Sequence, residues 1–238
     1  MKWTEISTDL FIELFSLHAE ELSPTEYWLE VVSILLEMDV EELEDLDPSE
    51  FSALKKQVSF IASEPPKEIL DHINGRNLIP FHKLTLGNIV DLNSFVTKDI
   101  PIHAIGKVNA ILYGAKSDDF ELMQNVVLAQ PIAPMYTLLN NFLEYRAKLL
   151  ENYSELFDEP DDDEEGEDSE QEDNGKVFSK WAWQKMIYDL AGGDIVTAKN
   201  VTELPHIMCF NWLLMQKELK LNQQVPTVAN RFGGASPI

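Results

Sequence analysis

FSKWAWQKMIYDLAGGDIVTAKNVTELPHIMCFNWLLMQKELKL, residues 178–221, is the stretch that decides the fold of this chain. It holds three of the five tryptophans of the protein: Trp181, Trp183 and Trp212. Apolar residues recur at helical spacing on both sides of a segment that contains two adjacent glycines. We therefore predict two helices joined by a loop near the end of the chain.

Each of these two helices has a recognisable boundary. The apolar face of the first helix has residues at i, i+4, i+7 and i+8, namely Trp183, Ile187, Leu190 and Ala191. Gly192-Gly193 ends this helix, because glycine readily takes the left-handed conformation that closes a helix. Thr202 is expected to cap the second helix, which has Pro205 in its first turn. We expect residues 192–202 to be a loop, too long for the turn of a DNA-binding helix-turn-helix.

The tryptophans require a large surface to pack against, since burying one such side chain contributes about 1.5–3 kcal/mol. This surface is either the rest of the chain or another protein, because interface cores are enriched in aromatic residues and Met. In the second case, the candidate partner-binding residues are Trp181, Trp183, Phe210 and Trp212.

The composition is that of a globular and strongly acidic protein. Hydrophobic residues make up 45% of the 238 residues, which is enough for a core, and the net charge is −24. No apolar run approaches the roughly 18 residues of a transmembrane helix, and the acidic residues near Met1 exclude an ordinary signal peptide. The single cysteine, Cys209, lies among apolar residues and is expected to be a buried thiol, consistent with a reducing compartment.

The most acidic segment directly precedes the tryptophan-rich stretch. Between Glu155 and Asp173 there are 13 acidic and no basic residues, and the chain without them still carries −11. Such a run cannot offset its ordering entropy, so we expect a solvated, disordered loop of about 20 residues between two helices. Its candidate contact residues are Asp161, Asp162, Asp163, Glu164 and Glu165. The acidic balance disfavours nucleic-acid binding and favours a cation-rich protein partner, with DNA mimicry as an alternative.

Helix-start signals punctuate the first third of the chain. Ser23 and Glu26 have the spacing of a capping box with proline between them at the first helical position. Asp39 and Asp47 each begin a similar signal, and a short first helix is expected to start at Thr8 or Asp9. We therefore expect three or four short helices to pack together in this region.

A β-hairpin is predicted in the middle of the chain, at about Ile69 to Phe81. It is centred on Asn74-Gly75, because a tight hairpin turn needs two residues that accept positive φ. Further helices are expected from Thr85, Pro101 and Ser117-Asp118. A longer helix is expected over residues 135–156, after Pro131 and Pro134.

These patterns predict a mainly α fold: a multi-helix bundle with one short β-hairpin and a disordered acidic loop. Five segments follow from them. They are an N-terminal helical region (residues 1–64), the hairpin with further helices (65–156), the acidic loop (157–176), the tryptophan-rich helical pair (177–221) and an extended tail (222–238).

No motif for catalysis or for metal binding is present in the sequence. The five histidines are scattered and no cysteine cluster accompanies them, whereas a zinc site needs three or four converging ligands. A glycine-rich phosphate loop, a nucleophile elbow and a Ser/His/Asp pattern are missing as well. We therefore predict a protein without enzymatic activity, bound metal or cofactor.

Two stretches resemble a known group of proteins. One comprises Trp181-Ala182-Trp183, residues 187–191, Gly193-Asp194-Ile195 and residues 201–205; the other is the hairpin followed by residues 83–87 and Asp91-Leu92. Together they resemble small phage proteins encoded among virion-assembly genes. That group includes tail-assembly chaperones and head–tail proteins of tailed phages, crAss-like phages among them. The resemblance covers about half the chain, does not include the acidic run, and implies a mainly helical fold without enzymatic activity.

Three functional hypotheses remain. The first is a non-enzymatic phage virion-assembly protein, similar to a tail-assembly chaperone, that binds a virion component through helical apolar surface. Its partners would be other phage virion or assembly proteins, with self-association left open and no direct nucleic-acid or membrane binding. It would act in the host cytoplasm, with incorporation into the virion left open.

The second hypothesis is a structural virion subunit at the head–tail connector, a ring or adaptor protein with the hairpin and tail as arms. The third is an acidic DNA-mimic inhibitor.

Overall fold

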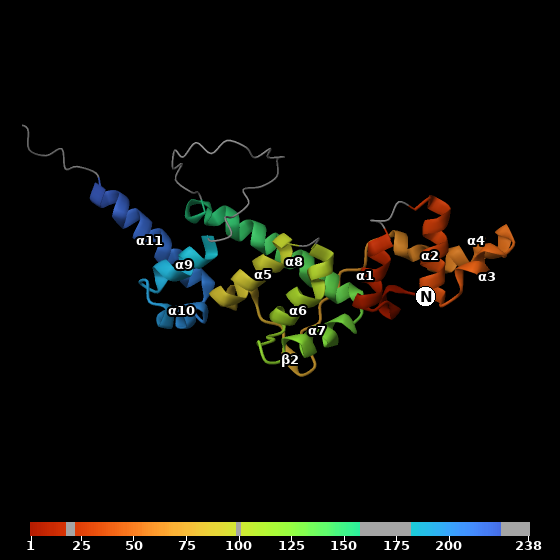
Figure 1. Cartoon of the computed structure of the whole chain (residues 1–238), viewed down its shortest axis with the longest axis horizontal. Coiled ribbons are helices and arrows are strands. Elements are labelled where there is room, and N and C mark those ends of the chain that lie inside the picture. Colours follow the sequence, from red (N-terminus) through yellow and green to blue (C-terminus); the bar gives the residue numbers. More distant parts are fainter. Residues whose placement is uncertain (18–21, 99–100, 158–181, 225–238) are drawn as a thin grey trace, which may run out of the picture. The chain divides into compact units, whose positions relative to one another are not determined.

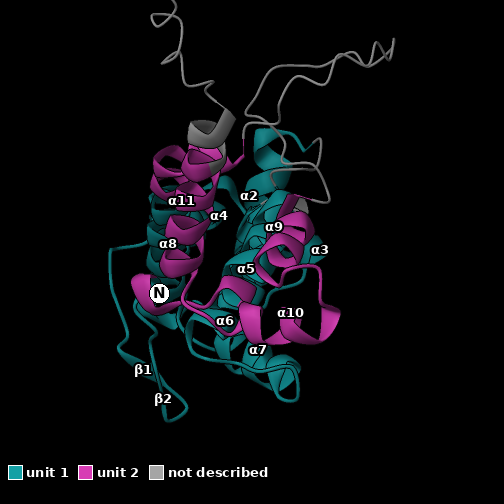
Figure 2. Ribbon diagram, turned by 90° about the vertical axis from the view of Figure 1, so that its left-hand side faces the viewer, with its two compact units in different colours: residues 1–81, 88–146 teal, residues 82–87, 147–238 magenta. Residues whose placement is uncertain are grey.

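The computed structural model describes residues 1–17, 22–98, 101–157 and 182–224. This part of the chain is mainly α-helical with one two-stranded antiparallel hairpin, which confirms the predicted fold class (Figure 1). The chain divides into two compact units: unit 1 comprises residues 1–81 and 88–146, and unit 2 comprises residues 82–87 and 147–238 (Figure 2). The predicted acidic loop, apart from its first residue, and the tail beyond Gln224 lie outside the described residues.

Among the described residues, unit 1 contains eight α-helices and the hairpin, together with short 3-10 turns. The helices and strands are α1 (Thr8–Ser16), α2 (Pro24–Leu36), α3 (Val40–Glu44), α4 (Pro48–Val58), β1 (His72–Ile73), β2 (Arg76–Asn77), α5 (Leu86–Lys98), α6 (Ile105–Leu112), α7 (Phe120–Leu128) and α8 (Ile132–Asn152). Two of these helices run across the boundary of the units, since the start of α5 and the end of α8 are assigned to unit 2.

The predicted caps of α2, α3 and α4 are confirmed. The Ser23 hydroxyl accepts a hydrogen bond from the Glu26 N–H at 3.3 Å, and the Glu26 carboxylate accepts one from the Ser23 N–H at 2.7 Å. Asp39 caps α3 without a reciprocal bond: its carboxylate accepts a hydrogen bond from the Glu41 N–H at 3.0 Å. At the start of α4 the Glu50 carboxylate accepts from the Asp47 N–H at 3.3 Å. These local hydrogen bonds satisfy N–H groups that have no partner within the helix.

The caps of two other helices lie one residue from the predicted positions. Ser7, and not Thr8 or Asp9, caps α1. Asp119, and not Ser117-Asp118, precedes α7. Ser, Thr and Asp are similarly good caps, so a run of such residues does not reveal which one begins the helix.

The hairpin is shorter than predicted and is tied to its own unit. Asn74 and Gly75 form the turn with φ of 50° and 75°, as the sequence predicts. The Arg76 guanidinium donates to the Gly114 carbonyl at 2.7 Å and also pairs with the Asp119 carboxylate. An isolated hairpin of this size is unstable in water, so these contacts with the helical part of unit 1 hold it in place.

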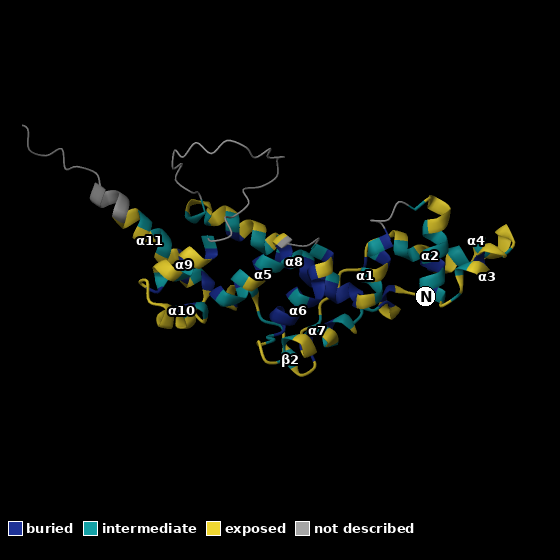
Figure 3. Ribbon diagram, viewed as in Figure 1, coloured by how far each residue is buried: buried dark blue, intermediate teal, exposed yellow. Residues whose placement is uncertain are grey.

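The core of unit 1 is centred on α6 and α8 (Figure 3). Its fully buried side chains include Ile105, Leu112, Tyr113, Ile132, Met135 and Phe142. The Asn109 amide donates to the Ile105 carbonyl at 2.9 Å and to the Met135 carbonyl at 3.2 Å, and so connects the two helices.

Helix α8 begins earlier than predicted. It covers Ile132–Asn152 and is followed by a 3-10 turn at Ser154–Leu156, whereas the sequence predicted one helix over residues 135–156. Pro134 lies in the first turn of α8, where the backbone N–H groups have no intrahelical partner. A proline there is compatible with the helix and does not mark a break before it.

Within the described residues 182–224, the tryptophan-rich end of unit 2 contains three helices instead of two. They are α9 (Ala182–Leu190), α10 (Ile195–Thr202) and α11 (His206–Gln224). Gly192 and Gly193, with φ of 63° and 81°, end α9 as predicted. The predicted loop over residues 192–202 is wrong, because α10 occupies most of it and Thr202 ends α10 instead of capping α11. Asp194 caps α10 and accepts hydrogen bonds from two backbone N–H groups at 3.0 and 3.2 Å.

The start of α11 is fixed by a short backbone pairing within unit 2. The Leu86 N–H donates to the Leu204 carbonyl at 2.8 Å, and the His206 N–H donates to the Leu84 carbonyl at 3.3 Å. Residues far apart in the sequence thereby hold the first turn of α11 in a defined position.

Candidate protein-binding face of unit 2

Helix α11 turns one side toward the core of unit 2. His206, Cys209 and Phe210 are between 0% and 2% exposed. The Phe210 ring contacts four neighbouring rings at centroid distances from 5.0 to 6.1 Å: Tyr153, Phe157, Trp183 and His206. Aromatic pairs of this kind contribute about 0.5–1.5 kcal/mol each beyond the area they bury. The aromatic cluster therefore fixes the rotation of α11 about its own axis.

The buried His206 completes this attachment. Its Nδ1 lies 2.7 Å from the Leu84 carbonyl oxygen, which is a hydrogen bond when Nδ1 carries the proton. Burial lowers the pKa of His206, the Leu84 hydrogen bond acts against this, and the nearby His82 lowers the pKa further. The neutral imidazole is therefore favoured in the folded protein.

The opposite side of α11 is apolar and exposed. Met208, Trp212, Met215 and Leu219, here called the α11 strip, are 49%, 51%, 41% and 52% exposed. They follow one another at intervals of four, three and four residues, so they lie along one side of the helix. An apolar strip of this kind on a surface helix is typical of a protein-binding face.

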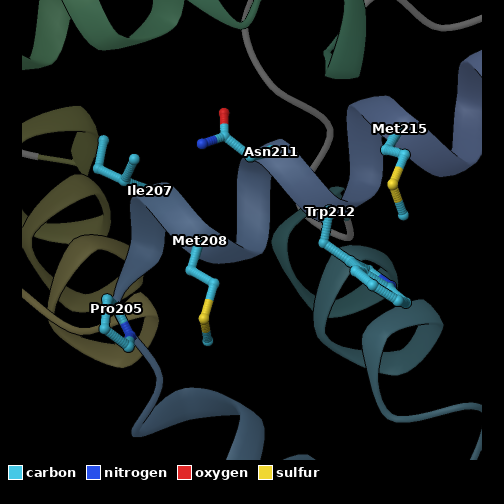
Figure 4. A pocket seen from close by; sticks show the side chains of 6 residues that line it. All are labelled: Pro205, Ile207, Met208, Asn211, Trp212 and Met215. Atoms are coloured by element: carbon cyan, nitrogen blue, oxygen red, sulfur yellow. The ribbon is translucent and has the colours of Figure 1, made fainter.

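A shallow groove of about 530 Å³ runs along this surface. It is lined by Pro205, Ile207, Met208, Asn211, Trp212 and Met215. Figure 4 shows Met208, Trp212 and Met215 along one edge of α11, with Ile207 and Asn211 along the other. The lining is almost entirely apolar, so it suits an apolar side chain of a partner better than a charged ligand.

Exposed apolar side chains are concentrated in unit 2. Among the described residues, eleven large apolar side chains are exposed, and only three of them, Met1, Ile69 and Leu122, belong to unit 1. The other eight are Tyr188, Ile195, Val196, Leu204 and the four residues of the α11 strip. The surface of unit 2 is thus the better candidate for a protein interface.

The charge near the α11 strip differs from that of the chain as a whole. Residues 195–224 contain two acidic residues, Glu203 and Glu218, and three lysines, Lys199, Lys217 and Lys220. This segment carries a net charge of +1 in a chain of −24. Because this segment is nearly neutral, another acidic protein can approach the α11 strip without strong electrostatic repulsion.

The four predicted partner-binding residues are placed very differently by the structure. Trp212 is exposed on the α11 strip, whereas Trp183 is 6% exposed and Phe210 is fully buried. Trp183 and Phe210 therefore support α11 from inside unit 2, where a partner does not reach them. Trp181 lies outside the described residues.

Three residues of the α11 strip were not among the sequence-predicted candidates. Met208, Met215 and Leu219 share one side of the helix with Trp212, and their spacing is visible in the sequence. Phe210 and Trp212 are two positions apart, which places them on opposite sides of a helix with 3.6 residues per turn. This spacing alone shows that both cannot lie on the same face of the helix.

The predicted acidic contact residues, Asp161, Asp162, Asp163, Glu164 and Glu165, lie outside the described residues. In the part of the chain that the structure describes, no three His, Cys, Asp or Glu side chains converge as metal ligands. Cys209 is buried as predicted, and burial raises the pKa of its thiol. Within the same ranges no helix combines the length and the apolar character needed to cross a membrane.

Comparison of this chain with models of protein families, with curated proteins and with solved structures finds no match.

Proposed function

We propose that this chain is a non-enzymatic phage virion-assembly protein that binds a virion component through the α11 strip. The observation that carries the proposal is the presence of four large apolar side chains, each between 41% and 52% exposed, along one side of a single helix. Covering apolar surface stabilises a complex by about 25 cal/mol per Å² before the entropic costs of association. The phage context comes from the sequence resemblance described above.

The mechanism would be the packing of an amphipathic helix of the virion component against the α11 strip. Trp212 is the proposed anchor, since tryptophan is among the residues that contribute most to interface energy. Met208 and Met215 flank it, and methionine adapts its shape to different apolar partners. The aromatic cluster around Phe210 holds α11 in place before binding, so little ordering of the receptor surface is required.

The acidic run, residues 155–173, would act before this contact. At −24 the chain attracts a cationic partner over a distance of about 10 Å at moderate salt, and the run supplies 13 of the 42 carboxylates. Deleting residues 158–174 is expected to leave the fold of the two units intact and to weaken capture mainly at low salt. Unchanged capture at low salt would contradict this steering role.

The direct test is affinity capture from phage-infected cells with the tagged full-length protein. We expect virion or assembly proteins to co-elute with the wild type and to be lost with Trp212→Ala. Leu122→Ala is the matched control, because Leu122 is also an exposed apolar residue on a helix but lies in unit 1. Equal capture by the wild type and Trp212→Ala would contradict binding through the α11 strip.

The alternative of a structural virion subunit makes a different prediction. It uses the hairpin as an arm, but Arg76 ties the hairpin to Gly114 and Asp119 of its own unit. No feature of the described residues therefore favours it over an assembly factor. Fixed stoichiometry of this chain in purified particles would support the structural subunit, and its loss during particle purification would support the assembly factor.

A further inference from the structure

We propose that the α11 strip of the free protein is covered by the α11 strip of a second copy, in an antiparallel pair related by a two-fold axis. This inference rests on the proposed function in one respect, the use of the α11 strip as the binding surface. It adds that the first occupant of this surface is the protein itself, which a virion component then has to displace.

The spacing of the strip is self-complementary in the antiparallel orientation. The intervals of four, three and four residues read the same in both directions, from Met208 to Leu219 and back. A two-fold interface brings the same patch of both copies together, so each residue i meets a residue j and each j meets an i. In an antiparallel pair Met208 would face Leu219 of the second copy, and Trp212 would face Met215 of the second copy.

The chemistry of these pairs fits the antiparallel orientation. A methionine sulfur packs favourably against an aromatic ring, which suits the contact of Trp212 with Met215. In a parallel pair Trp212 would face Trp212 and Met215 would face Met215, so no methionine sulfur would lie directly opposite the Trp212 ring.

Electrostatics restricts where two copies can meet. Two chains of −24 repel each other, and the repulsion is largest where carboxylates concentrate. The segment 195–224 carries a net charge of +1. Between Met208 and Leu219, the ends of the α11 strip, Glu218 is the single acidic residue. An apolar and nearly neutral surface of this kind allows close approach of a second acidic copy.

The area of the strip predicts a weak dimer. Four side chains that are about half exposed bury roughly 400 Å² on each copy, or about 800 Å² in total. Stable specific interfaces bury at least about 1,200 Å², so this pair is reversible at moderate protein concentration. Reversibility is required if a virion component is to replace the second copy.

Sedimentation velocity of the full chain over a range of concentrations tests the pairing. We expect a monomer–dimer equilibrium for the wild type and for Leu122→Ala. We expect a dissociation constant at least about thirtyfold higher for Trp212→Ala, the effect of losing a central interface residue. Raising the salt concentration is expected to strengthen the dimer, because it screens the repulsion between acidic chains. A monomer at all concentrations, or a dimer unaffected by Trp212→Ala, overturns the proposal.

Disulfide trapping tests the orientation. The antiparallel pair places residues 208 and 219 of different copies opposite each other, within the Cα separation of about 7 Å that a disulfide allows. Met208→Cys/Leu219→Cys is therefore expected to give a covalent dimer on oxidation. Met208→Cys alone is not expected to do so, because the two copies of residue 208 would lie about 16 Å apart along the helix axis. The wild type is the control, since its Cys209 is buried.

The outcomes also separate this inference from the proposed function. Efficient trapping by Met208→Cys alone would indicate a parallel pair and overturn the antiparallel arrangement. A monomeric protein that still loses virion proteins with Trp212→Ala would overturn self-pairing and leave the proposed function in place. A dimer that captures no virion protein would overturn the proposed function and leave self-pairing in place.

Discussion

Phe210 and Trp212 are two residues apart on α11, and replacing each by alanine should have opposite consequences. Phe210 is fully buried in the aromatic cluster of unit 2, whereas Trp212 is 51% exposed on the α11 strip. We predict that Phe210→Ala destabilises unit 2 and that Trp212→Ala leaves it nearly as stable as the wild type while weakening binding.

The magnitude follows from burial. Phe→Ala in a packed core costs about 3–5 kcal/mol, the sum of the lost transfer free energy and the cavity left behind. Phe210 has four aromatic neighbours within 6.1 Å, so the upper half of this range is expected. Truncating the half-exposed Trp212 should cost about 1 kcal/mol or less, because about half of its surface is in water before the change.

Hydrogen exchange of the full-length protein, followed by mass spectrometry of peptides from residues 182–219, reads the stability of unit 2 directly. The measurement is made at low protein concentration so that self-association does not contribute. Peptides from α6 in unit 1 serve as the internal control, and their exchange should not change in either variant. A larger loss of protection in Trp212→Ala than in Phe210→Ala would refute the assignment of the two sides of α11.

Two further predictions concern pH and helix capping. Burial places the folded-state pKa of His206 below its usual value, so its stabilisation is present above about pH 6.5 and is lost as the pH falls through the folded-state pKa. Hydrogen exchange at pH 7.5 and 5.5, corrected for intrinsic rates, should show this loss of stability in unit 2. His206→Asn should make the difference between the two pH values smaller. Ser23→Ala should destabilise α2 by about 1 kcal/mol, measured as faster exchange of its first turn.

Features that depend on neighbouring residues were predictable from the sequence. The capping boxes at Ser23 and Asp47, the turn at Asn74-Gly75 and the glycine end of α9 each arise from hydrogen bonds or φ values within a few residues. Neither the packing partners nor the tertiary fold is needed to predict them.

Helix α10 was missed for an equally physical reason. Ile195 and Val196 are 85% and 77% exposed, and Val201 is the one residue of α10 that is buried. The helix therefore lacks the apolar periodicity by which buried helices are recognised. Asp194 was available as a cap, but Thr202 is an equally good cap by residue type. Position in the fold, through the pairing of Leu204 and His206 with residues 84–86, decides where α11 begins.

The sequence also left open which side of α11 faces the core. Both sides are apolar, with Phe210 and Cys209 on one and Trp212 and Met208 on the other. Hydrophobicity alone does not distinguish them, and the aromatic rings of Tyr153 and Trp183, distant in sequence, settle the choice. The same ambiguity explains why the sequence offers both Phe210 and Trp212 as candidate anchors.

Ionic strength should distinguish the two proposed occupants of the α11 strip. Self-pairing brings two chains of −24 together. Salt screens the electrostatic repulsion between them and therefore strengthens the pair. The same negative charge attracts a cationic virion component. Salt screens this attraction and therefore weakens capture. When both dissociation constants are measured against salt concentration, that of the dimer should fall and that of the complex with the virion component should rise. Slopes of the same sign would mean that the two partners do not differ in charge as proposed, or that they do not share the α11 strip.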